Sequence, residues 1–267
     1  MSSARHHLGP ATEVARTAVL GGAPAVQQPS GAFLGFPLAG APEVTQVSTS
    51  WAGYLVHGGP GAFTTVEARW TEPAADCTDA PYDTLAAIWV GLDGSAGGKG
   101  TVQQTGTVSS CTEGEREYTA WFEMWPDVAV FYNDPVEPGD RLWARVEYIG
   151  NDTYELFLRN ITKKWTEVTY AKPPKGTDPK RASAEVIVEA GMGPRGTHFL
   201  TKFARVAVTS AKINGKSLGD SDAWKVIMKQ DGVLKATTSG LTGGGSSFRV
   251  TWKDWGTRIR GTHRRPR

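Results

Sequence analysis

Two short segments, roughly 80 residues apart, each place a chemically usable polar side chain in a run that otherwise has the pattern of a buried β-strand. Residues 102–106 read Val-Gln-Gln-Thr-Gly, and residues 184–189 read Ala-Glu-Val-Ile-Val-Glu. Successive side chains of a strand point to opposite faces, so Glu185 and Glu189 share one face. A carboxylate can take a proton from attacking water and return it to a leaving group, while the Gln104 amide can orient that water and stabilise the oxyanion. This combination indicates hydrolysis.

Two further segments, residues 88–93 and 118–125, divide in the same way between an apolar set and a set with aromatic and acidic members. Indole rings interleaved with carboxylates on one surface suit the binding of an extended polymer, either peptide or sugar. The alternative is an ordinary solvated face, but such faces favour Thr, Lys and Ser. The residues that this pattern places on the polar face are Trp89, Asp93, Trp121, Glu123 and Trp125.

Other hydrolytic chemistries find little support. Of the five histidines, only His57 and His198 fall within the run of strand-like segments, which leaves little for a zinc site or a Ser/His/Asp triad. No Gly-x-Ser-x-Gly or Asp-Thr-Gly sequence occurs, and the glycine-rich residues 91–100 lack the ending of a phosphate-binding loop. We therefore expect no metal and no cofactor.

Five motifs together give the chain a recognisable order. It resembles the glutamic peptidase (eqolisin) family over roughly residues 46–252, and that family consists of acid-acting endopeptidases with a catalytic Gln and Glu on a β-sandwich. The motifs are Trp-Ala-Gly-Tyr at 51–54, Trp-Val-Gly-Leu-Asp-Gly at 89–94, Gln-Thr-Gly at 104–106, Ala-Trp-Phe-Glu-Met-Trp-Pro at 120–126 and Ala-Glu-Val-Ile-Val-Glu at 184–189.

The resemblance implies that Gln104 and Glu189 form the catalytic dyad, that the substrate is a polypeptide, and that pepstatin does not inhibit cleavage. Thr119 stands where members of the family carry an Asp, so we expect a pH optimum shifted upward. The residues that the resemblance implies around the substrate groove are Trp51, Trp89, Asp93, Glu123 and Trp125.

The elements that must position these residues are short strands separated by Gly, Pro, Asn and Asp signals, with almost no helical periodicity. This predicts an all-β fold, a β-sandwich of two antiparallel sheets of the concanavalin-like lectin and glucanase type. The expected strands span residues 51–56, 62–70, 85–92, 101–108, 117–125, 141–149, 154–160, 167–170, 184–189, 199–213, 223–229, 233–238 and 248–252.

Composition predicts three parts: a flexible extension at 1–45, a strand-rich domain at 46–257 and a basic tail at 258–267. The resemblance implies that the domain is a peptidase and that the extension is propeptide-like. The tail carries five arginines and no acid, and removing those charges from the overall +2 leaves −3 for the rest. Because the tail has no basic counterpart elsewhere, we expect a solvated end and no nucleic-acid partner. No apolar stretch approaches the roughly 20 residues of a membrane span, so we expect no membrane partner either. We expect a secreted monomer, although residues 17–26 make a poor signal-peptide core.

The two cysteines, Cys77 and Cys111, flank the strands that carry Asp93 and Gln104 and belong to no Cys/His cluster. They predict one disulfide, worth on the order of 3 kcal/mol, with two reduced thiols as the alternative.

A carbohydrate-active or carbohydrate-binding β-sandwich protein is the main alternative function. It would pair Glu123 with Glu189 or Glu185 at glycosidase separation and leave Gln104 without a role.

Overall fold

The computed structural model describes residues 45–95, 100–193 and 196–257. Within them the regular structure is almost entirely β, with one short 3₁₀ helix, η1 (Leu218–Asp220). The strands are β1 (Thr45–Ser48), β2 (Trp51–His57), β3 (Thr65–Thr71), β4 (Ala75–Asp76), β5 (Thr84–Asp93), β6 (Val102–Thr112), β7 (Glu115–Trp125), β8 (Val130–Pro135), β9 (Arg141–Gly150), β10 (Thr153–Asn160), β11 (Trp165–Ala171), β12 (Ser183–Glu189), β13 (Met192–Gly193), β14 (Gly196–Thr197), β15 (Phe199–Leu200), β16 (Lys202–Phe203), β17 (Val206–Ile213), β18 (Lys216–Ser217), β19 (Trp224–Gln230), β20 (Val233–Thr238) and β21 (Phe248–Trp252).

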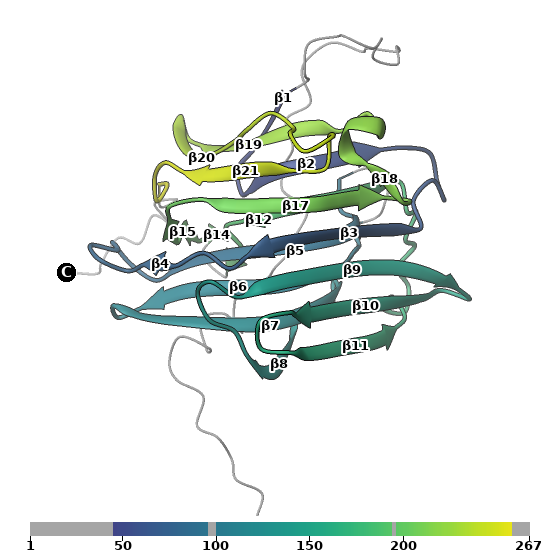
Figure 1. The fold of residues 1–267 in the computed structure, drawn as a ribbon, viewed down its shortest axis with the longest axis horizontal. Helices are drawn as coiled ribbons and strands as arrows, with labels where there is room; N and C mark the ends of the chain where they lie inside the picture. The colour runs from purple at the N-terminus through teal and green to yellow at the C-terminus, as the bar shows by residue number, and fades with distance from the viewer. Residues whose placement is uncertain (1–44, 96–99, 194–195, 258–267) are drawn as a thin grey trace, which may run out of the picture.

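Seventeen of these strands form one continuous hydrogen-bonded sheet. A first run follows the order β1-β19-β2-β12-β5-β6-β7-β8, and a second follows β21-β17-β3-β9-β10-β11. Strand β20 pairs with both β19 and β21 and so joins the two runs. Figure 1 shows the second run as successive strands from β17 through β3, β9 and β10 to β11.

The main hydrophobic core uses one face of each run. On β12, Val186 and Val188 enter this core, together with Val66 of β3, Val146 of β9 and Leu156 of β10. Ile187 points to the opposite face of β12. There it belongs to a second, smaller apolar cluster with Trp51 of β2, Trp89 of β5 and Trp121 of β7. The central strands of the first run, β2, β5, β6 and β12, are therefore buried on both faces, and the second face is the one that holds the candidate site.

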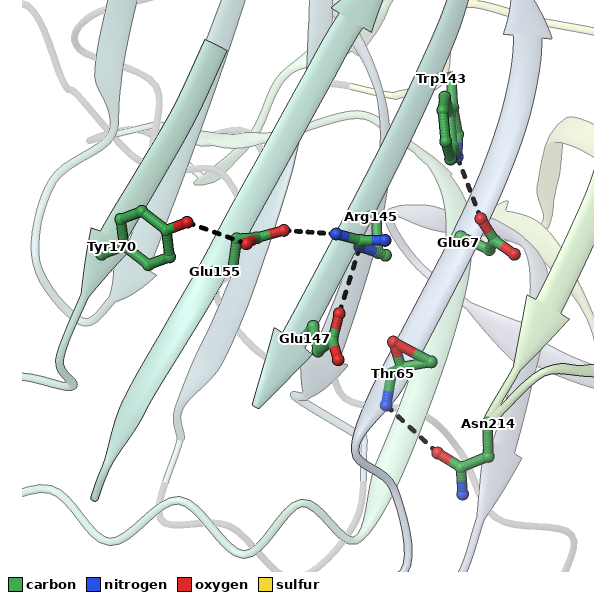
Figure 2. Close-up of polar contacts among 8 residues, drawn as sticks. All are labelled: Thr65, Glu67, Trp143, Arg145, Glu147, Glu155, Tyr170 and Asn214. Carbon is green, nitrogen blue, oxygen red and sulfur yellow. Dashed lines mark hydrogen bonds and ion pairs between the residues drawn. The ribbon is translucent and has the colours of Figure 1, made fainter. Parts of the chain in front are cut away.

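The outward face of the second run carries charged groups that pair with one another (Figure 2). Arg145 forms ion pairs with Glu147 and Glu155, and Tyr170 donates a hydrogen bond to Glu155 over 3.1 Å. The side chains of Arg145 and Glu147 are 32% and 41% exposed. Exposed pairs of this kind contribute little to stability, so Glu147 is a suitable control position for experiments on the other face.

The all-β prediction is confirmed, whereas the finer prediction of two antiparallel sheets of the concanavalin-like type is not. The hydrogen bonding is continuous through β20, and two strand pairs, β1–β19 and β15–β5, are parallel. The strand expected over 199–213 is wrong as one element, because the structure divides it into β15, β16 and β17. The short turns between these pieces allow β15 to pair with β5 and β16 with β4.

Cys77 and Cys111 form the predicted disulfide, with Cα atoms 5.5 Å apart. Both sulfurs lie in a small apolar cluster with Ala75. Among the described residues no helix is long and apolar enough to cross a membrane. The predicted extension at 1–45 lies outside the described residues except for Thr45, which begins β1, and the predicted tail at 258–267 lies wholly outside them.

Candidate active site

Register places Gln104 and Glu189 on the same face of the first run. On β5, Gly91 lies opposite Gln104 of β6 and also opposite Glu185 of β12, while Ala87 lies opposite Glu189. Glu189 is therefore two strands from Gln104 and displaced by four residues along β12. The shared parity follows from the period-two pattern of each strand, as the sequence predicted.

Gln104 is held by Glu123, its cross-strand neighbour on β7. Its side-chain Nε2 donates a hydrogen bond to Glu123 Oε2 over 2.6 Å, and both side chains are fully buried. Burial raises the pKa of the Glu123 carboxyl well above its ordinary value, and the nearby charge of Glu189 raises it further, while the bond from Gln104 opposes both effects. In acid, Glu123 is therefore neutral.

Glu189 is held from the middle of the face by an indole. Trp89 lies between the register positions of Gln104 and Glu189, and its Nε1 donates to Glu189 Oε2 over 2.9 Å. The ring also leans over Gly91, where an added Cβ would come within 2.8 Å of Trp89 Cζ3. Glycine at 91 thus makes room for the indole that orients Glu189.

Two more indoles complete the aromatic part of the face. Trp51 pairs directly with Glu189 in the sheet and meets Trp89 edge to face, with ring centroids 5.1 Å apart. Trp121 of β7 belongs to the same cluster and is fully buried, whereas Trp125 packs against the cluster and is only partly buried. The structure therefore brings together six of the seven residues named for the dyad and groove: Gln104, Glu189, Trp51, Trp89, Glu123 and, packed against the cluster, Trp125.

Asp93 has a different environment from the one that its predicted groove position suggests. It is buried at the end of β5, with φ of 65°, and its Oδ1 accepts a hydrogen bond from the backbone N–H of Ala182 over 3.0 Å. Burial raises its pKa, and backbone hydrogen bonds from residues 180–182 oppose that rise. Its observed contact fixes the segment that leads into β12, which is a structural task.

Glu185 is a carboxyl that the sequence placed on this face and gave a catalytic task only in the carbohydrate-active alternative. It is fully buried, level with Gln104, and burial raises its pKa well above the ordinary value, with Asp93 adding to the rise. Thr119 lies on the same face, opposite Val108. Strand parity predicted that these carboxyls share one face. It did not predict that Glu123, Glu185 and Glu189 are all fully buried.

Sequence reasoning also missed a pair at the edge of the site. His57 Nε2 lies 2.8 Å from Ser95 Oγ. In the described part of the chain no carboxylate bonds the ring, so the pair does not make a Ser/His/Asp triad. The described residues also contain no group of three His, Cys, Asp or Glu side chains arranged to hold a metal.

Comparisons of the sequence and of the fold with known proteins both lead to the same family of peptidases. Residues 49–252 match the sequence profile of the Peptidase A4 family. A relative from Aspergillus niger, aspergillopepsin-2, is 29% identical over 158 residues, which cover 58% of this chain and 55% of the relative. The chain therefore spans just over half the length of this curated relative.

Solved structures have the same fold. A crystal structure of scytalido-glutamic peptidase with a transition state analog inhibitor superposes with a TM-score of 0.66 at 21% identity, covering 77% of this chain and 98% of that one. Aspergilloglutamic peptidase from Aspergillus niger superposes with a TM-score of 0.55 at 25% identity, covering 64% and 99%. Since the profile covers most of the chain, this protein belongs to the Peptidase A4 family, the glutamic peptidases or eqolisins.

Proposed function

We propose that this chain is an acid-acting glutamic endopeptidase in which Gln104 and Glu189 are the catalytic dyad. The observation that carries the proposal is the buried set of polar groups on one sheet face. Gln104 is fixed by Glu123, Glu123 lies within the electrostatic reach of Glu189, and Glu189 is oriented by Trp89. Family membership supports the same reaction class.

In the proposed reaction, ionised Glu189 takes one proton from a water whose oxygen bonds to the scissile carbonyl carbon. The Gln104 amide, oriented by its bond to Glu123, donates an N–H to the oxyanion of the tetrahedral intermediate. Glu189 then returns its proton to the peptide nitrogen as the C–N bond breaks. The products are an amine and a carboxylic acid, and Glu189 is again ionised.

A neutral Glu123 accounts for activity at acid pH in this proposal. Two neighbouring buried carboxyls do not both ionise readily, and it is the Glu123 pKa that burial and Glu189 raise. With Glu123 protonated, the site has a single negative charge on the base. As the pH rises through the raised pKa, a second negative charge forms beside the position of the oxyanion and opposes the reaction.

The same proposal includes the domain bounds, the arrangement of the strand runs, the substrate groove and the location of the enzyme. Residues 46–257 form the peptidase domain, the two strand runs serve as layers of a concanavalin-like sandwich, and the indoles, Asp93 and Trp125 line or support a groove for an extended polypeptide. The enzyme is an extracellular monomer that uses neither metal nor cofactor. Since Gln104, Glu123 and Glu189 have no exposed surface, part of the chain must move before a peptide reaches them.

The test is digestion of an unfolded protein at acid pH, with and without pepstatin. The proposal expects pepstatin-insensitive cleavage that falls about 100-fold to 1000-fold in kcat in Gln104→Ala, the loss seen when one oxyanion donor is removed from other hydrolases. Glu147→Gln, which changes an exposed carboxylate on the far face, should retain full activity. Absence of proteolysis together with cleavage of a glucan would instead favour the carbohydrate alternative, in which Gln104 has no role.

A further inference from the structure

A partly buried histidine, His57, extends the candidate site toward the end of β2 on the same sheet face. On β2, Trp51 and Leu55 point into the apolar cluster of that face, and His57 has the same parity. It pairs with Ser183 of β12, two residues before Glu185. His57 therefore lies one strand beyond β12, and unlike the fully buried Trp51, Trp89 and Trp121 it retains exposed surface.

The imidazole is fixed in place from two sides. Its Nε2 lies 2.8 Å from Ser95 Oγ, and the Ser95 backbone N–H donates to Ser183 Oγ over 3.2 Å. The indole of Trp224, from β19, meets the ring edge to face with centroids 5.2 Å apart. The described residues give the other ring nitrogen, Nδ1, no hydrogen-bond partner, so this nitrogen can bond to a ligand.

The charged groups around His57 allow it to become a cation in acid. From β12 the facing groups are Ser183 and Glu185, and from β5 the facing group is Asp93, which binds the Ala182 backbone. Lys225 of β19 has the opposite parity to Trp224 and belongs to the other face. Burial lowers the His57 pKa, and burial raises those of Glu185 and Asp93, so in sufficiently strong acid the neighbouring carboxyls are neutral and the imidazole carries the charge.

We propose that His57, Ser95 and Trp224 form a substrate subsite that selects a peptide residue with a side-chain carbonyl oxygen, glutamine or glutamate. His57 Nδ1–H donates to that oxygen, Ser95 fixes the ring, and the Trp224 indole packs against the aliphatic part of the side chain. This inference rests on the proposed peptidase function and adds the substrate class that the site prefers.

The test uses a set of peptides that differ at one position on either side of the cleaved bond, with Gln, Glu, Met or Lys at that position. The readout is the ratio of kcat/KM for the Gln peptide to that for the Met peptide. At the peptide position that occupies the subsite, we expect a wild-type ratio of about 10 or more. A Met side chain leaves the His57 Nδ1–H donor without an acceptor, which weakens its binding. Lys should be the poorest residue there, since cationic His57 repels it.

In His57→Leu the ratio should fall to about 1, and in His57→Gln, which keeps an N–H donor, it should be partly restored. Glu147→Gln serves as the control and should keep the wild-type ratio. A ratio that is unchanged in His57→Leu at every position, with peptides still cleaved, overturns the subsite alone. If the wild-type enzyme cleaves no peptide, the proposed function fails and the subsite fails with it.

Discussion

A buried carboxyl outside the candidate site, Glu72, should make the whole fold more stable in acid than at neutral pH. Glu72 follows β3 and is 1% exposed. Its Oε2 accepts hydrogen bonds from Thr107 Oγ1 over 2.6 Å and from Trp70 Nε1 over 3.3 Å. Burial is the main cause that raises its pKa to about 7, and the charge of Asp140 adds to the rise, while the two hydrogen bonds oppose it.

The sign of the effect follows from proton linkage. The pKa of Glu72 is higher in the folded chain than the ordinary value of 4.5, so the folded state binds the proton more tightly than the unfolded state does. The stabilisation is fully present below pH 4.5 and is lost as the pH rises through about 7. Since one pKa unit corresponds to about 1.4 kcal/mol, the loss amounts to about 3 kcal/mol.

Glu72→Gln removes the titrating group and keeps an oxygen that can accept from Thr107. We expect the variant to match the wild type near pH 4 and to exceed it by up to about 3 kcal/mol near pH 8, or about 6–12 °C in Tm for a domain of this size. The assay is denaturant unfolding followed by tryptophan fluorescence at both pH values, with Glu147→Gln as the control. Equal pH dependence in Glu72→Gln and the wild type would refute the reasoning.

Three further predictions concern the site, the disulfide and the N-terminal segment. Glu123→Gln should abolish the decline of kcat that accompanies ionisation of Glu123, so its pH–rate profile should extend toward neutral pH; a profile identical to the wild type would contradict the neutral-acid role. Replacing Cys77 and Cys111 together by Ser should cost about 3–4 kcal/mol for a separation of 34 residues, measured by unfolding, and a cost near zero would show that the crosslink does not constrain the unfolded chain. The resemblance to the family implies a propeptide-like segment at the N-terminus, so a chain that begins at Glu43 should be more active than the full chain, and acid incubation should trim the full chain before Trp51. Equal activity of both forms would mean that the segment has no inhibitory effect.

Strand parity is the part of this protein that the sequence predicts best. The alternation of β12 placed Glu185 and Glu189 opposite Val186, and the structure has the same division between the two faces. Parity depends only on the two-residue period of an extended chain, so it holds wherever the strand is recognised. It does not give the register between strands, and the four-residue displacement of Glu189 from the level of Gln104 was therefore not foreseeable.

Contacts between segments far apart in the chain were the part that could not be predicted. The hydrogen bond that the Ala182 backbone donates to Asp93 joins residues 89 positions apart, so no local pattern could predict it. The raised pKa of Glu72 could not be predicted, because it results from burial that only the folded core produces. His57 was set aside for lack of a triad, and its pairing with Ser95 depends on a loop conformation that no local pattern encodes.

The central claim is that the Glu189 carboxylate is the base of a peptidase, and its most direct test is kcat/KM of Glu189→Gln on an unfolded protein at acid pH. The substitution keeps the size of the side chain and an oxygen for the Trp89 bond, so thermal unfolding should change little. We predict a loss of at least about 1000-fold, larger than the loss for one oxyanion donor, while Glu147→Gln remains at the wild-type level. Retention of more than about a tenth of the wild-type kcat/KM in folded Glu189→Gln would contradict the account.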